Sequence, residues 1–195
     1  MALEKRISAE QLFWSIGVVS GEFEAVRLEL QTADASANDA NETEANSETP
    51  ETPETRADDD PRSSDIPRTA EQLVKNSETL TTLQKQLQSV FGNPPKEPEV
   101  DFTPTVAGAL FLMHSEDFRR LLIPRPGNLI NRLSELKSHE EIIDELFLCV
   151  LSRRPDSKER VDVANYLKIN DDRKTERLAN LTWALLTSTE FMVNH

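Results

Sequence analysis

The side chains best suited to catalysis or metal binding are few and widely spaced in this sequence. The three histidines, His114, His139 and His195, occupy unlike contexts, and none belongs to a CxxC, HExxH or CxxCH pattern. Zinc and c-type haem sites depend on such ligand spacings, and no GxGxxG or GxxxxGK[ST] phosphate loop is present. We therefore predict no catalytic, cofactor-binding or metal-binding residue, with His139 exposed and His114 at or near the surface.

The only cysteine, Cys149, lies within the apolar run LFLCVL. A reactive thiol needs an accessible, electropositive setting, whereas burial raises the thiol pKa and leaves the group inert. We therefore expect Cys149 to be a core residue rather than a nucleophile. A single thiol cannot form an internal disulfide, and it does not identify a compartment.

Charged side chains supply two weaker candidate sites. Glu140–Glu141 and Asp171–Asp172 lie at predicted helix starts, where acidic side chains complement the helix dipole, so a general acid–base pair is not indicated. Six arginines could line an anion site, although arginines on separate helices are more often surface charges. They are Arg119, Arg120, Arg125, Arg153, Arg154 and Arg160.

The elements that position these residues are predicted to be about seven helices, with no strand. Ser8 and Gln11 form a capping box near the start of the first helix, and Gly21 can end it. The predicted helices cover residues 1–23, 69–91, 104–122, 128–136, 139–154, 156–167 and 174–186, with a final turn at 188–193. The third helix has Thr103 as its cap, and its predicted buried face consists of Val106, Ala109, Leu110 and Met113. The sixth is predicted to bury Val161, Ala164 and Leu167.

Residues 31–66 have a different composition from the rest of the chain. They hold eleven acidic residues against two arginines, a net charge of −9, and Ile66 is their only large aliphatic residue. Such a segment cannot bury enough apolar surface to offset chain entropy, so we predict a disordered acidic linker. The predicted organisation is an N-terminal helix of the bundle (1–30), this linker, and a helical domain (67–195). The linker is interpreted as a solvated spacer, with an acidic binding tail as the alternative.

Overall composition limits the classes of partner. The 195 residues carry a net charge of −13 and contain 37% hydrophobic residues, below the roughly 45–50% typical of globular domains. An acidic chain is repelled by phosphate backbones and anionic lipid, so we expect neither nucleic acid nor membrane as a partner. No apolar run approaches the roughly 20 residues of a membrane helix, and no signal peptide is visible. The sequence leaves the location in the cell unassigned, and a protein partner is the class that fits.

Several stretches resemble a known family. ELFLCVLSRRPDSKERVDVANYL and LANLTWALLTSTEFMVNH are similar to the C-terminal conserved domain of unknown function in large planctomycete cytochrome-c-type proteins. In that family a helix ends in an LSR-x-P motif and the chain closes with a WALLNSSEFLFNH-like ending. TPTVAGALFLMHSEDF resembles the family's PSxxQALFLMN segment, and RISAEQLFWSIGVVSG its LSAEQLxDALxxATG helix. The resemblance covers most of residues 5–25 and 90–195.

The resemblance implies an assembly context rather than an activity. Family members usually carry a secretion signal, a CxxCH haem module and a second conserved domain, none of which is in this sequence, so the chain is interpreted as a C-terminal fragment. No catalytic residue is carried over. The leading hypothesis is a non-catalytic all-α interaction or structural module of a larger cytochrome-c-associated protein. The alternative is the C-terminal part of an enzyme whose active site lies in missing upstream sequence.

Overall fold

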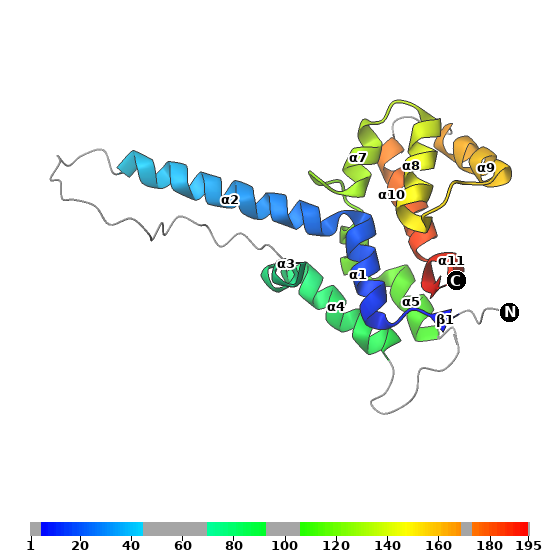
Figure 1. The fold of residues 1–195 in the computed structure, drawn as a ribbon, viewed down its shortest axis with the longest axis horizontal. Coiled ribbons are helices and arrows are strands. Elements are labelled where there is room, and N and C mark those ends of the chain that lie inside the picture. The colour runs from blue at the N-terminus through cyan, green and yellow to red at the C-terminus, as the bar shows by residue number, and fades with distance from the viewer. Residues whose placement is uncertain (1–4, 45–69, 93–105, 169–172, 195) are drawn as a thin grey trace.

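The structure is a computed structural model that describes residues 5–44, 70–92, 106–168 and 173–194. Over these residues the fold is all-α, as predicted, with eleven helices and one pair of two-residue strands (Figure 1). The helices are α1 (Ala9–Ser20), α2 (Glu22–Glu44), α3 (Ala70–Asn76), α4 (Glu78–Phe91), α5 (Val106–His114), α6 (Glu116–Arg120), α7 (Leu129–Glu135), α8 (His139–Leu151), α9 (Ser157–Lys168), α10 (Lys174–Leu186) and α11 (Thr189–Met192). The strands are β1 (Lys5–Arg6) and β2 (Val193–Asn194).

Helix α1 begins at the predicted capping box and ends at the predicted glycine, so it is shorter than the range 1–23 predicted for it. Gln11 N donates to Ser8 Oγ at 3.1 Å, and Ser8 N donates to Gln11 Oε1 at 2.9 Å. Gly21, with φ 72°, then turns the chain directly into α2. A Cβ at Gly21 would lie 2.9 Å from the Gly127 carbonyl oxygen. The elbow between α1 and α2 therefore fits against the loop before α7 only because position 21 has no side chain.

An ion pair fixes this elbow at the start of α2. Glu22 is fully buried and pairs with Arg125 of the loop before α7. The Arg125 guanidinium also contacts Glu29 at 2.9 Å. Burial lowers the pKa of Arg125 from its usual value. The Glu22 carboxylate lies in the first turn of α2, where it also complements the helix dipole. The same side chain therefore stabilises α2 and joins α2 to the loop before α7.

Helix α2 corrects the predicted disorder of residues 31–66 over the first part of that segment. The helix continues to Glu44, and its second half projects away from the other helices (Figure 1). Residues 31–44 include four alanines, the strongest helix former, and a helix already nucleated at the elbow extends at low cost. A low apolar content disfavours packing but not helix formation. The helix crosses the boundary predicted at residue 30, and residues 45–66 lie outside the described residues.

Two helices predicted to be continuous are each divided at a serine. Ser77 separates α3 from α4 and accepts from Leu80 N at 3.3 Å, whereas Ser115 separates α5 from α6 and accepts from Phe118 N at 3.2 Å. Serine favours an N-cap because its hydroxyl oxygen competes for backbone N–H groups. These two breaks, together with α2 and the short α11, explain why the described residues contain eleven helices where about seven were predicted. The predicted cap Thr103 lies outside the described residues.

The buried core joins the apolar faces of most helices. Helices α4, α8 and α10 each bury part of the apolar stripe that helical spacing predicts for them, whereas Val90, Leu151, Leu181 and Leu185 of these stripes are half-buried. The buried residues of these three stripes are Leu80, Leu83, Leu87, Ile142, Ile143, Leu146, Phe147, Val150, Leu178 and Leu186. From α1 and α6, Phe13, Ile16 and Phe118 extend the same core and are almost fully buried.

Helix α10 also joins three other helices through side-chain hydrogen bonds near their C-terminal ends. Lys174 Nζ donates to two carbonyl oxygens at the end of α7, at 2.8 and 2.6 Å. Arg177, which is buried, donates to two carbonyl oxygens in the last turn of α9, both at 3.2 Å. Trp183 Nε1 donates to a carbonyl oxygen in the last turn of α5 at 3.0 Å. One helix therefore satisfies acceptors that helix geometry leaves free.

The predicted buried face of α5 is wrong. Its exposed residues are Val106, Ala109, Leu110 and Met113, with the first 77% exposed. The buried contact comes instead from Leu112 on the opposite side. Because α5 is apolar all round, periodicity cannot select which face packs. On α9, Leu167 is buried as predicted and Ala164 is half-buried, but Val161 is 57% exposed.

The two ends of the described chain meet in the pair β1–β2. Lys5 pairs with Asn194 and Arg6 with Val193, in antiparallel register. Ile7 N extends the contact by donating to the Met192 carbonyl oxygen at 3.3 Å. Strands of two residues are too short to give the alternating pattern by which a strand is predicted.

Candidate interaction groove

The residues predicted as weak candidates for chemistry are not brought together. His114 is exposed at the end of α5, and His139 is half-buried at the start of α8, where exposure was predicted. Glu140–Glu141 lie exposed in the first turn of α8, which suits the helix dipole. His195 and Asp171–Asp172 lie outside the described residues. Within the described ranges, no group of three His, Cys, Asp or Glu side chains could hold a metal ion.

Cys149 is half-buried rather than a full core residue. It lies at the edge of the apolar face of α8, where its Sγ is 3.4 Å from Glu145 Oε1 and 3.5 Å from an Arg132 guanidinium nitrogen. Burial, followed by the charge of Glu145, raises the pKa of the Cys149 thiol, and Arg132 only partly opposes this. The predicted direction of the pKa shift is confirmed, and the thiol is poorly suited to nucleophilic chemistry.

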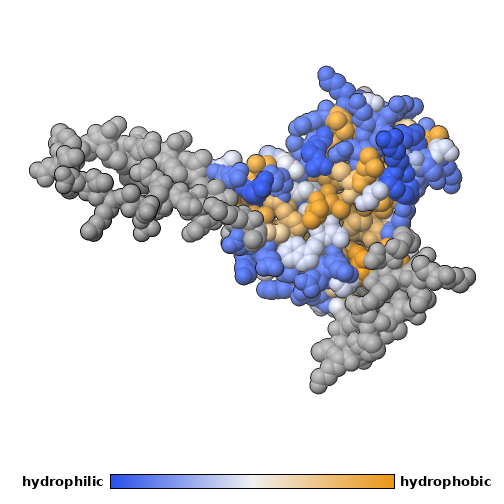
Figure 2. All heavy atoms as spheres, in the orientation of Figure 1, coloured by the Kyte–Doolittle hydropathy of each residue, from blue (hydrophilic) through white to orange (hydrophobic). Residues whose placement is uncertain are grey.

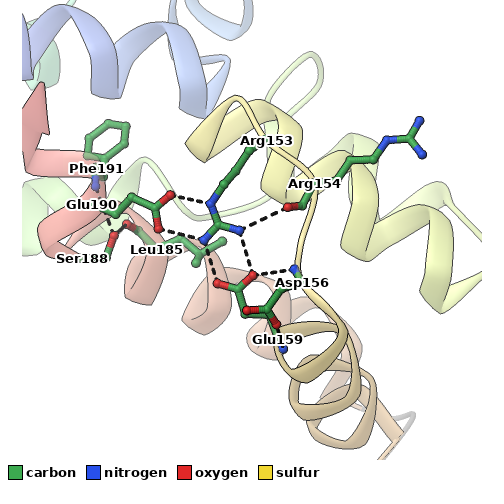
Figure 3. A network of polar contacts seen from close by, with 8 residues as sticks. All are labelled: Arg153, Arg154, Asp156, Glu159, Leu185, Ser188, Glu190 and Phe191. Carbon is green, nitrogen blue, oxygen red and sulfur yellow. Dashed lines mark hydrogen bonds and ion pairs between the residues drawn. The ribbon is translucent and has the colours of Figure 1, made fainter. Parts of the chain in front are cut away.

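The six candidate arginines contact separate partners instead of forming one anion site. Besides the pairing of Arg125 with Glu22 and Glu29, Arg160 contacts Asp144 at 2.5 Å. On α6, Arg119 donates to the Met113 carbonyl oxygen at 2.9 Å, and Arg120 lies 3.5 Å from Asp117. Arg154 is exposed, and its side chain points away from the neighbouring network (Figure 3).

Arg153 is the arginine with the most extensive contacts, because it lies between two carboxylates (Figure 3). Its guanidinium donates to both oxygens of Glu190, at 2.5 and 2.8 Å, and to both oxygens of Glu159, at 2.8 and 2.7 Å. These hydrogen bonds lower the pKa of Glu159 to about 2 and raise that of Arg153 above its usual value. The side chain thereby joins the loop after α8 to both α9 and α11. We call these three residues the Arg153 network.

A groove of about 600 Å³ lies beside this network, between α1, the end of α8 and the α11–β2 segment. Most of its lining residues have apolar side chains, polar and apolar atoms share its surface about equally, and Val18 on α1 is 69% exposed. The lining residues are Trp14, Ser15, Val18, Val19, Cys149, Val150, Leu151, Ser152, Glu190, Phe191 and Val193. Figure 2 shows apolar residues gathered across the middle of this face of the molecule, with hydrophilic residues above and below them. This arrangement can bind apolar side chains but contains no set of groups for acid–base or nucleophilic chemistry.

The polar part of the groove has acceptor character. Helices α1, α8 and α11 each contribute lining residues, and none of the three has a basic side chain in its last turn. The C-terminal end of a helix carries partial negative charge. Ser152 caps α8 in the left-handed region with φ 55°, and it is the one non-glycine with positive φ among the described residues. Glu190 of the Arg153 network completes this edge.

Sequence patterns indicated only part of the groove. The sequence pattern predicts Val19 on the packed face of the first helix and Phe191 and Val193 on the final turn, but it gives no reason to connect them. The helical spacing of Leu12, Ile16, Val19 and Phe23 predicts an apolar stripe that Phe13 and Trp14 widen, and Val18 lies outside it. Val18, an apolar residue next to the predicted stripe, was therefore a sequence signal for the α1 side of the groove. It does not identify the residues of α8 and α11 that form the other side.

Comparison with known proteins gives no assignment: no family model, curated protein or solved structure matches this chain. Among the helices in the described residues, none is both long and apolar enough to cross a bilayer.

Proposed function

We propose that this chain is a non-catalytic protein-interaction module that binds its partner in the groove between α1, α8 and α11. The observation that carries the proposal is the groove itself, most of whose lining residues have apolar side chains, with Val18 69% exposed at α1. Exposed apolar surface in a concave site is typical of binding sites. The proposal includes the context implied by the sequence resemblance, in which the chain is part of a larger cytochrome-c-associated protein.

A site-specific photo-crosslinking experiment tests this function. Benzoylphenylalanine placed at position 18 in cells that express the chain should give a discrete protein adduct, identified by mass spectrometry. Position 161 on α9 is the matched control, because Val161 is 57% exposed and lies outside the groove. An adduct pattern at position 18 indistinguishable from that at position 161 contradicts the proposal.

A ligand screen addresses the non-catalytic part of the proposal. Purified protein is titrated with haem, zinc and nucleotides, and thermal unfolding is monitored. Because a ligand that binds only the folded state raises Tm, we expect no shift with any of them. A saturable shift with one of these ligands, or turnover by the purified chain, would overturn the interpretation as a binding module.

A further inference from the structure

We propose that the partner element bound in the groove is a basic amphipathic helix, an inference that rests on the proposed function. Binding of a helix in a groove requires an apolar cleft that accepts side chains spaced three and four residues apart. It also requires complementary charge along the edges of the cleft. The groove beside α1 has both properties, and each can be tested separately.

The apolar walls favour a macromolecular helix over a small ligand. Trp14 and Val18 belong to α1, and Phe191 faces the groove from α11. A bound small molecule normally has most of its surface buried. With Val18 69% exposed, the α1 side of the groove is open to solvent, and a small ligand there would stay uncovered. A helix brings additional surface of its own and covers this side.

The charges at the groove favour a cationic partner. Two arginines follow the Ser152 cap of α8: Arg153 is paired with Glu159 and Glu190, and the Arg154 side chain points away from this network (Figure 3). The last turn of α8 itself lines the groove and holds no basic residue. Beside it, the Arg153 network combines one guanidinium with two carboxylates and has a net charge of −1. Lysine or arginine side chains of a partner can therefore approach the helix end without meeting an unpaired cation of the network.

The same charges argue against other occupants. A second copy of the chain would add another net charge of −13, and nucleic acid would add phosphate charges. Both would be repelled at low ionic strength. A basic helix from a different protein is the occupant that satisfies the apolar walls and the acceptor edge together.

Binding of model peptides to the full chain tests the inference. Three fluorescent peptides of about 18 residues are compared at roughly 0.15 M salt: an amphipathic leucine–lysine helix, the same helix with glutamine for lysine, and a scrambled leucine–lysine sequence. We expect the ordered leucine–lysine helix to bind most tightly. Val18→Asp should weaken that binding by about tenfold, because a carboxylate would enter the apolar contact. Val161→Asp adds the same charge outside the groove and should leave affinity unchanged.

A second pair of variants isolates the role of charge. Ser152→Lys places a cation at the end of α8. It should weaken binding of the leucine–lysine helix by about two- to fivefold and leave binding of the leucine–glutamine helix unchanged. Ser152→Gln imposes the same backbone requirement without charge and is the control. The inference is overturned if the glutamine or scrambled peptide binds as tightly as the leucine–lysine helix, or if no peptide binds while position 18 still gives its crosslink. Equal weakening by Val18→Asp and Val161→Asp would instead contradict the groove itself.

Discussion

Gly21 shows how one residue sets the direction of the chain between α1 and α2. Its backbone is left-handed, and a Cβ would lie 2.9 Å from a carbonyl oxygen and 3.0 Å from the Asn128 Cα. We expect Gly21→Ala to destabilise the protein by more than the roughly 1–2 kcal/mol that a left-handed backbone costs an L-residue, because the clash adds to that cost. Chemical denaturation monitored by circular dichroism measures the change.

Ser152 is the matched comparison, because it also has a left-handed backbone but its side chain is exposed. Ser152→Gly relieves the backbone without creating a clash, so we expect stabilisation of up to about 1 kcal/mol. If both glycine-related variants shift stability in the same direction, the interpretation of these two positions is wrong.

The Arg153 network makes stability depend on acid pH. Hydrogen bonds from Arg153 lower the pKa of Glu159 to about 2 from an ordinary value of 4.5. Ionised Glu159 therefore contributes stability that is fully present above about pH 4.5 and is lost as the pH falls toward 2. We expect wild type to be more stable than Glu159→Gln at pH 6 and the difference to disappear by about pH 2. Thermal unfolding at several pH values measures this, and a constant difference would contradict the assignment.

At the residue scale, local contacts were predictable and distant ones were not. The Ser8–Gln11 capping box follows from a spacing of three residues, as does Asp156 with Glu159, where both hydrogen bonds are 2.8 Å. Arg153 and Glu190 are 37 residues apart. Nothing in their local sequence distinguishes this pair from the other arginines and acids.

At the scale of the elements, α10 joins α7, α9 and α5 through polar side chains. We expect Arg177→Met to destabilise the protein by about 1–3 kcal/mol, because two carbonyl oxygens in the last turn of α9 lose a charged donor in a buried setting. Arg154→Met, at an exposed position, should change stability by less than about 0.5 kcal/mol. Urea denaturation of both variants provides the comparison. Equal effects would show that the α10–α9 contact has no special energetic role.

Element boundaries were predictable where a cap or glycine marks them. The turn at Gly21 and the start of α7 at Asn128, whose side chain accepts from Asn131 N at 2.9 Å, follow from residue type. The break at Ser77 was missed because the leucine stripe of α3 continues into α4. The packed face of α5 was missed because both of its faces are apolar, and only the position of the neighbouring helices selects between them.

For the whole molecule, the sequence predicted the all-α class but not the groove. Helical periodicity predicts which side chains are buried, and it identified most of the buried face of α4 and α8 and part of that of α10. The groove depends on how the fold places α1 across from α8 and α11, which lie more than 100 residues away in the chain. Contact between such distant segments leaves no local pattern, so the candidate site could be found only from the arrangement in space.

The short β1–β2 pair also has a mechanical consequence. The chain enters at Lys5 and leaves at Asn194 on the same end of the ladder, so tension applied to both ends would open the hydrogen bonds one after another, like a zipper. The next segment to be pulled away would be α11, which carries Phe191 and Glu190. Stretching the polypeptide would therefore remove one wall of the groove while the interior packing of α4, α8 and α10 remained intact.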